Sequence, residues 1–196
     1  MKWLAVLFWL AGPFWEAKAP VDWTENEVNQ LLTNSPWAQM LDAPSKAGSS
    51  TVQVFLATSA PIEQAERQWD LRFKKNRPGS PANNRDEEFQ AWLNENRAKQ
   101  IVIAVMVNLP QALSDEQETH RMEEECVMRV GRKKLKMSGY FPPSAADPYL
   151  RLAFPREVST NDKNVIFDLY LPGVPIPFRQ ADFKVKDMLF KGKLEM

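Results

Sequence analysis

One short stretch of the sequence combines three side-chain types that bind zinc. His120, Glu124 and Cys126 fall within the run H-R-M-E-E-E-C. On a helix, His120 and Glu124 share a face, and Cys126 lies about one further turn along. Imidazole, carboxylate and thiolate groups are all zinc ligands, but catalytic zinc sites usually recruit several histidines, and His120 is the only one here. We therefore favour a solvated acidic helix ending in a buried cysteine, and predict no metal and no other cofactor.

Nucleophilic catalysis has little support in these residues. A Ser-His-Asp or Cys-His pair would have to use His120, which lies too close to Cys126 in sequence for a typical pair. The chain has no G-x-S-x-G elbow, and its seven glycines form no phosphate-binding loop. Two carboxylates from distant positions remain possible, with Asp168 beside Tyr170 as one candidate. The alternating strand around Asp168 indicates instead an outward-facing side chain.

Aromatic and basic clusters offer two possible binding surfaces. Exposed tryptophans stack on sugars or peptides, but each tryptophan after residue 20 falls at an apolar position of a predicted helix or its start, which favours core packing. Trp37 is the binding candidate among them, because its short turn has little other apolar content. A second cluster, of basic residues, could meet an anionic partner or a membrane surface. It could also form a solvated, aggregation-resistant edge, which we favour. The tryptophans are Trp23, Trp37, Trp69 and Trp92, and the cations are Arg129, Arg132, Lys133, Lys134 and Lys136.

The N-terminus has the pattern of a secretory signal peptide. Lys2 precedes an apolar run from Trp3 to Trp15, and Ala17-Lys18-Ala19 supplies a small-x-small cleavage pattern. At about 1.5 Å per residue, the run is too short to cross a hydrocarbon layer roughly 30 Å thick. We predict a signal peptide over residues 1–19, cleavage near Ala19, and a periplasmic or secreted product. Pro20 is a poor residue after the cut, so the exact site stays open, and a retained N-terminal segment is an alternative.

The residues after the signal peptide predict one α+β domain over 20–196. Residues 20–125 are helix-rich, beginning with a capping box at Thr24 and Glu27, and residues 126–196 are β-rich. The expected fold is a mostly antiparallel sheet with two or three helices packed on one side. We predict helices after Thr24, Ser35, Ser59, Asp86 and Ser114, and loops over 42–50 and 76–85. We predict strands over 51–58 and 100–107 and near 150–154 and 165–171, with a hairpin around Gly131. A turn near Asp187 should return Met188 and Phe190 to the core.

Three segments resemble a family of small exported bacterial proteins of unknown function. They are W-T-E-N-E-V-N-Q-L-L-T-N-S-P-W-A from Trp23, the strand-to-helix junction from Ala57 to Arg67, and the ending F-K-V-K-D-M-L-F-K-G-K-L-E-M. The stretch from Ser35 to Ala38 is the most distinctive. The resemblance implies export and single-domain size, and it implies no activity and no catalytic residues.

Composition excludes few functions. The 196 residues carry 25 basic and 25 acidic side chains, so the surplus of positive charge typical of nucleic-acid binders is missing. With a single cysteine, no intramolecular disulfide can form, and the core alone must hold the fold. We expect an exported, non-catalytic module that binds an unknown envelope protein or surface, without nucleic acid and without stable membrane insertion of the mature chain. The alternative is a small exported hydrolase using carboxylates, with or without a metal.

Overall fold

The computed structural model describes residues 12–45, 48–74, 87–107, 113–144 and 147–196, and it confirms the α+β class with antiparallel sheets. The strands divide between a five-stranded sheet of order β1-β2-β3-β7-β6, a four-stranded sheet of order β5-β4-β8-β9, and the ribbon β10-β11. The strands are β1 (Ala38–Ser45), β2 (Gly48–Leu56), β3 (Gln100–Met106), β4 (Val127–Val130), β5 (Lys133–Lys136), β6 (Gly139–Phe141), β7 (Tyr149–Pro155), β8 (Asn164–Tyr170), β9 (Phe178–Lys184), β10 (Leu189–Phe190) and β11 (Lys193–Leu194).

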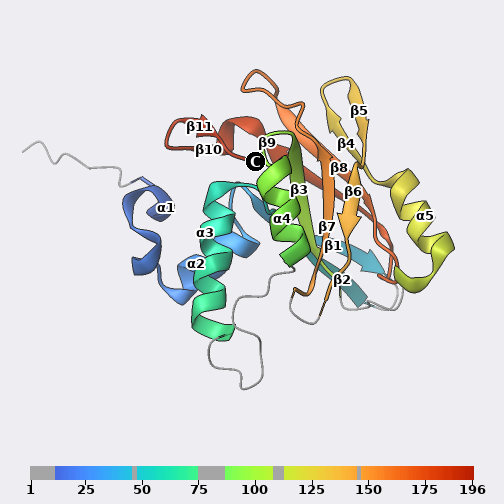
Figure 1. The fold of residues 1–196 in the computed structure, drawn as a ribbon, viewed down its shortest axis with the longest axis horizontal. Coiled ribbons are helices and arrows are strands. Elements are labelled where there is room, and N and C mark those ends of the chain that lie inside the picture. Colours follow the sequence, from blue (N-terminus) through green and yellow to red (C-terminus); the bar gives the residue numbers. More distant parts are fainter. Residues whose placement is uncertain (1–11, 46–47, 75–86, 108–112, 145–146) are drawn as a thin grey trace, which may run out of the picture.

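Helices α3 (Ala60–Trp69) and α4 (Glu87–Asn96) cover one face of the five-stranded sheet through their contacts with Arg151 of β7, and the four-stranded sheet covers the other face. Figure 1 shows α3 and α4 side by side, and α5 (Glu116–Glu125) on the other side of the molecule, beside β8 of the four-stranded sheet. The helical elements are α1 (Phe14–Ala17), η1 (Pro20–Asp22), α2 (Glu25–Thr33), α3 (Ala60–Trp69), η2 (Asp70–Lys74), α4 (Glu87–Asn96), α5 (Glu116–Glu125) and η4 (Val185–Asp187). Within the described residues, no helix is long and apolar enough to cross a membrane.

Strand β7 shows how the layers join. Phe154 points toward the four-stranded sheet and meets Phe167 of β8 with ring centroids 5.3 Å apart. Arg151, at the opposite parity, points toward the helices, where its guanidinium lies 4.7 Å from the ring centroid of Phe89 on α4. Since successive side chains of a strand point to opposite faces, one strand is buried on both sides. The resulting hydrophobic cluster runs from Trp23 to Met196.

Several predicted elements are confirmed. Strand β3 lies at the centre of its sheet and is buried over its five inner positions, as its apolar run indicates. The hairpin around Gly131 forms from β4 and β5. The 3-10 turn η4 restores Met188 and Phe190 to the core, as the change of parity predicts. The predicted loop over 76–85 and the predicted cap Asp86 lie outside the described residues.

The segment from Ser35 to Ser50 is where the local prediction is wrong. A helical turn after Ser35 and a loop over 42–50 are expected, but the chain forms the hairpin β1–β2, in which Ala38 pairs with Phe55 and Ser45 with Gly48. The Ser35 hydroxyl donates to the Leu31 carbonyl and accepts from the Trp37 N–H at 3.2 Å, which closes a tight turn instead of a helix. Pairing with β2 then overrides the loop-like composition, and Pro44 is tolerated because β1 is an edge strand.

Helix α5 begins one residue later than predicted. Asp115, not Ser114, is the N-cap, and its carboxylate accepts from the N–H groups of Gln117 and Glu118. A carboxylate at this position also suits the positive end of the helix dipole. Met122 and Cys126 supply the thin apolar face, as expected.

The capping box of α2 gives a test of local stability. The Thr24 hydroxyl accepts from the Glu27 N–H at 3.2 Å, and Glu27 accepts from the Thr24 N–H at 2.8 Å. Thr24→Ala removes the hydrogen bond that the Thr24 hydroxyl accepts. We expect it to lower the free energy of unfolding by about 1 kcal/mol in urea titrations. Thr33→Ala, at the other end of the same helix, is the control and is expected to change stability by less than about 0.5 kcal/mol. Equal effects of the two substitutions would contradict the capping role.

Candidate functional site

An open groove lies between β1 and β9, which are edge strands of the two different sheets. Its volume is about 610 Å³, and its walls are the chain turn after α2, the start of β1, the end of β9 and the following 3-10 turn. The lining residues are 33–36, 38–40, 182–184 and Asp187. The groove therefore includes three residues of the distinctive Ser35-Pro36-Trp37-Ala38 stretch.

Side chains bridge the two edge strands where no strand ladder forms. Gln39 Nε2 of β1 donates to the Asp182 carbonyl of β9 at 2.6 Å, and Asn164 Nδ2 donates to Asp182 Oδ1 at 2.7 Å. Met40 stands 46% exposed on the same wall. The groove thus combines edge-strand backbone, mixed charges and an exposed thioether. This chemistry suits an extended polypeptide segment, which needs both backbone and side-chain partners.

The edge strands differ in how they are protected against pairing with another chain. Strand β5 carries exposed lysines at 133, 134 and 136, which oppose the approach of a further strand. Strand β6 spans only Gly139–Phe141, and Phe141 packs on Phe89 and Trp92 of α4. Strand β1 spans eight residues and has no lysine or arginine. Asp42 and Pro44 protect its second half, whereas its first half, Ala38–Leu41, has no charged residue or proline and borders the groove.

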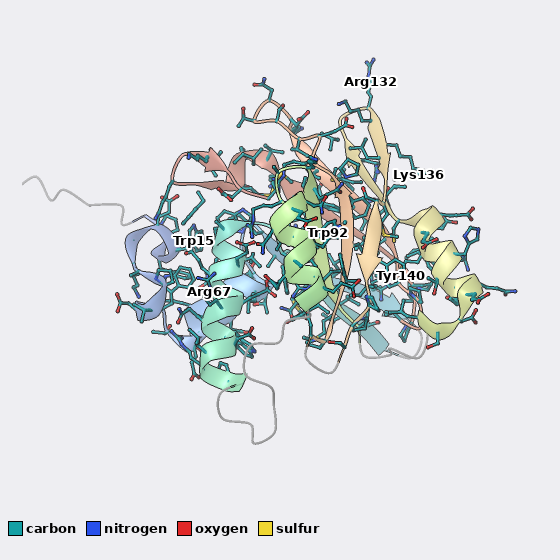
Figure 2. All side chains as sticks on the ribbon, in the orientation of Figure 1. Trp15, Arg67, Trp92, Arg132, Lys136 and Tyr140 are labelled. Carbon is teal, nitrogen blue, oxygen red and sulfur yellow. The ribbon has the colours of Figure 1, made fainter. Side chains whose placement is uncertain are left out.

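The basic hairpin β4–β5 divides into paired and solvent-facing cations. Arg129 Nε and Nη2 contact the two carboxylate oxygens of Asp168 at 2.6 and 2.9 Å, and Lys133 Nζ contacts Glu157 at 2.8 Å. Arg132 extends away from the tip of the hairpin (Figure 2). Two of the predicted cluster's cations are therefore used within the fold, which supports the interpretation as a solvated edge.

The three candidate zinc ligands, for which the sequence favours no metal, differ in burial. His120 Nε2 and Glu124 Oε1 are 3.4 Å apart, and their side chains are 70% and 65% exposed. Cys126 is fully buried, where its thiol lies 3.5 Å from the Tyr170 carbonyl and 3.2 Å from the Tyr170 N–H. Nowhere in the described ranges do three His, Cys, Asp or Glu side chains gather as a metal site. The structure thus brings together two of the three candidates on a solvent-exposed helix face.

The tryptophans mostly serve the core. Trp37 is 0% exposed, and its indole N–H donates to the Glu195 carbonyl at 2.8 Å. Trp23 is also buried, and Trp92 packs against Phe141. Trp69 is the exception at 37% exposed, where it lies against Phe73. Trp37, the binding candidate, is therefore inaccessible while the chain around it is in place.

Asp168 and Tyr170 also have structural partners. Burial raises the pKa of Asp168, but hydrogen bonds from Arg129 and Gln180 outweigh that effect and hold the pKa below its ordinary value. The Tyr170 hydroxyl donates to Glu118 at 2.7 Å, and the Arg121 guanidinium lies 4.4 Å from its ring centroid. Asp168 is thus a carboxylate held ionised on the outer face of the sheet, as the alternating strand predicts.

A buried ionic cluster escaped the sequence analysis. Arg151 of β7 donates from Nη2 to Glu66 of α3 at 2.8 Å and from Nε to Asp147 at 2.6 Å. All three side chains are less than one-tenth exposed. Burial lowers the pKa of Arg151, but attraction to the two carboxylates outweighs it and raises that pKa above its ordinary value. Burial, with the nearby Glu66 carboxylate, raises the pKa of Tyr149 in the same region.

The geometry of this cluster favours a structural role. Each carboxylate is paired with the same guanidinium, whose face lies on the Phe89 ring, so that the cluster joins α3, α4 and β7. General acid catalysis by a carboxylate requires access to substrate, which side chains buried to this degree do not give. The signal in the sequence is faint, because an arginine between Leu150 and Leu152 reads as the polar side of an amphipathic strand.

Removing the charge of Arg151, the central cation of the buried cluster, should strongly destabilise the fold. Arg151→Met leaves Glu66 and Asp147 buried without their shared cation, and we expect the free energy of unfolding to fall by about 3–5 kcal/mol. Arg129→Met removes a solvent-accessible ion pair on the other sheet and should cost less than about 1 kcal/mol. Urea unfolding of both variants beside the parent protein measures the difference. Similar losses for the two would show that the buried cluster is no more important than a surface pair.

The Cys126 thiol gives a second test. Burial raises its pKa to about 11, so little thiolate exists in the folded protein near neutral pH. We expect a thiol reagent such as Ellman's reagent to label the folded protein at pH 8 far more slowly than the urea-unfolded protein. Because the unfolded thiol ionises first, stability should fall as pH rises from about 9 to about 11.

Cys126→Ala is the matched control for this pH dependence. The variant lacks the ionising thiol, so its loss of stability over the same pH range should be smaller by about 2 kcal/mol. Rapid labelling of the folded parent protein at pH 8, or an unchanged slope in the variant, would contradict the burial of this thiol.

Comparison with known proteins adds no function to this geometry. No family model matches the chain, and no match was found among curated proteins or among solved structures. The groove between β1 and β9, the buried ionic cluster and the packing around Trp37 are thus the features from which a function can be inferred.

Proposed function

We propose that this protein is an exported, non-catalytic module that assembles with another component of the cell envelope through the groove between β1 and β9. The observation that carries the proposal is the edge of β1, whose first half, Ala38–Leu41, contains no charged residue and no proline. It has eight residues, lacks basic side chains, and borders an open groove with an exposed Met40. Natural proteins protect such edges unless the edge is used, and strand addition is a common mode of peptide recognition.

The groove chemistry defines the kind of partner. Asp182, Lys184 and Asp187 supply charges of both signs, so the groove selects no strongly charged ligand. Met40 offers a flexible apolar contact, and methionines are common at surfaces that accept varied partners. An extended peptide segment with alternating polar and apolar side chains fits these contacts. Export is the remaining part of the proposal, and it rests on the N-terminal pattern and on the family resemblance.

The side chains suited to catalysis have other partners. The Ser35 hydroxyl, which borders the groove, is used in the turn after α2. Asp168 is bound by Arg129 and Gln180, and the carboxylates of Glu66 and Asp147 are bound by Arg151. These pairings favour a binding role over the alternative of a small exported hydrolase.

Export is tested by the mass of the product. Expression of the full chain in a Gram-negative bacterium should yield a periplasmic or secreted protein that begins near Pro20. Intact-mass spectrometry of the fractions measures this start. A full-length product in the cytoplasm would contradict export, and a full-length product at the membrane would indicate that the N-terminal segment is retained.

Binding through the groove is tested by site-specific photo-crosslinking in the same cells. A photoreactive amino acid at Met40 should give a discrete crosslinked species whose second component is an envelope protein. The control is the same amino acid at Leu71, which is 50% exposed in η2, directly after α3, and lies outside the groove. Equal crosslinking from both positions, or none from Met40, would exclude the groove as the assembly surface.

A further inference from the structure

The segment Pro13–Ala19, which we call the arm, is seated on an aromatic surface of the domain. Trp15 meets Trp37 edge-to-face with ring centroids 5.8 Å apart, and Phe14 meets Trp23 at 5.9 Å. Phe190 packs on Trp37 from the β10–β11 ribbon. The side chain of Trp15 points from α1 toward the rest of the molecule (Figure 2). The last residues of the predicted signal peptide therefore help to bury Trp23 and Trp37.

Polar contacts fix the arm on this surface. Glu16 Oε1 accepts from the Lys191 N–H at 3.0 Å, and Lys18 pairs with Glu27 of α2. Lys191 and Gly192 form the tight turn of the β10–β11 ribbon with φ values of 49° and 75°, and neither belongs to the strand pairing. A turn of this kind leaves an N–H free for an outside acceptor. The surface thus recognises a carboxylate next to an aromatic pair.

The arm leaves one buried polar atom without a partner. Trp23 is 2% exposed, and its indole N–H has no hydrogen-bond partner. A buried donor without an acceptor is unfavourable, so a peptide that brought a carbonyl to this N–H would gain a hydrogen bond that the arm does not make. The surface is a formed site whose present occupant does not satisfy it fully.

We propose that the surface under the arm binds a short peptide segment of another protein that carries two adjacent aromatic residues followed by a carboxylate, and that loss of the arm opens this site. The arm itself shows the chemistry of such a ligand, through Phe14, Trp15 and Glu16. Opening by signal-peptide cleavage rests on the proposed export, because cleavage near Ala19 removes every arm contact. The site also adjoins the groove, since Trp37 lies between Pro36 and Ala38, which line it.

The test uses a fluorescent peptide with the arm sequence, G-P-F-W-E-A-K-A, and fluorescence anisotropy. The protein recovered from the export experiment, beginning near Pro20, should bind the peptide at least about ten-fold more tightly than the full chain, whose own arm competes. A full chain carrying Phe14→Ser and Trp15→Ser should bind it as the processed protein does. This variant tests the site even if processing fails, so that failure of export and failure of the site are distinguishable.

Two sets of controls separate recognition from nonspecific adhesion. In the peptide, replacement of the tryptophan by alanine should weaken binding by about ten-fold or more, and replacement of the glutamate by glutamine should weaken it several-fold. In the protein, Phe190→Ala should weaken binding, whereas Trp69→Ala, outside the site, should not. Circular dichroism confirms that each protein is folded. The proposal is overturned if the folded processed protein and the folded arm variant bind the peptide no better than a scrambled peptide.

Discussion

Burial of both faces of β7 is the constraint on which the rest of the structure depends. Its even-numbered side chains, ending with Phe154, fill the space between the two sheets, and its odd-numbered side chains meet the helices. A chain without a disulfide must obtain its stability from such burial, and one strand here contributes to two interfaces. On the side that faces the helices, this burial includes the charged Arg151. Its charge can be buried because two carboxylates pair with the guanidinium and an aromatic ring packs against it.

The same arrangement explains why a groove exists. Two sheets that pack face to face and do not close into a barrel leave edge strands where they meet. On one side of this molecule, those edges are β1 and β9, bridged by Gln39 and Asp182 instead of by a ladder. The turn at Ser35–Ala38 then places Pro36 and Ala38 in the groove and Trp37 beneath the arm. One short segment therefore connects the two surfaces that we infer to bind peptides.

Much of the fold could be predicted from local pattern, because periodicity and caps report the environment of each side chain directly. The buried run of β3, the capping box at Thr24 and the parity change before Met188 are of this kind. Strand β1 was not predictable in this way, since its Gly-, Ser- and Pro-rich hairpin depends on pairing with β2. The division into two sheets likewise depends on contacts between distant residues. For the candidate sites, local reading placed Asp168 and the basic hairpin correctly on the surface, but the Arg151 cluster required three separate segments to converge.

The single thiol has a consequence for the conditions under which this chain can fold. Cys126 lies in the core and resists ionisation, so in the folded protein an oxidant meets little thiolate from which to form a sulfenic acid or a mixed disulfide. With no second cysteine, the nascent chain also has no wrong disulfide to isomerise within itself. Folding of this chain therefore requires no formation or isomerisation of a disulfide bond within it.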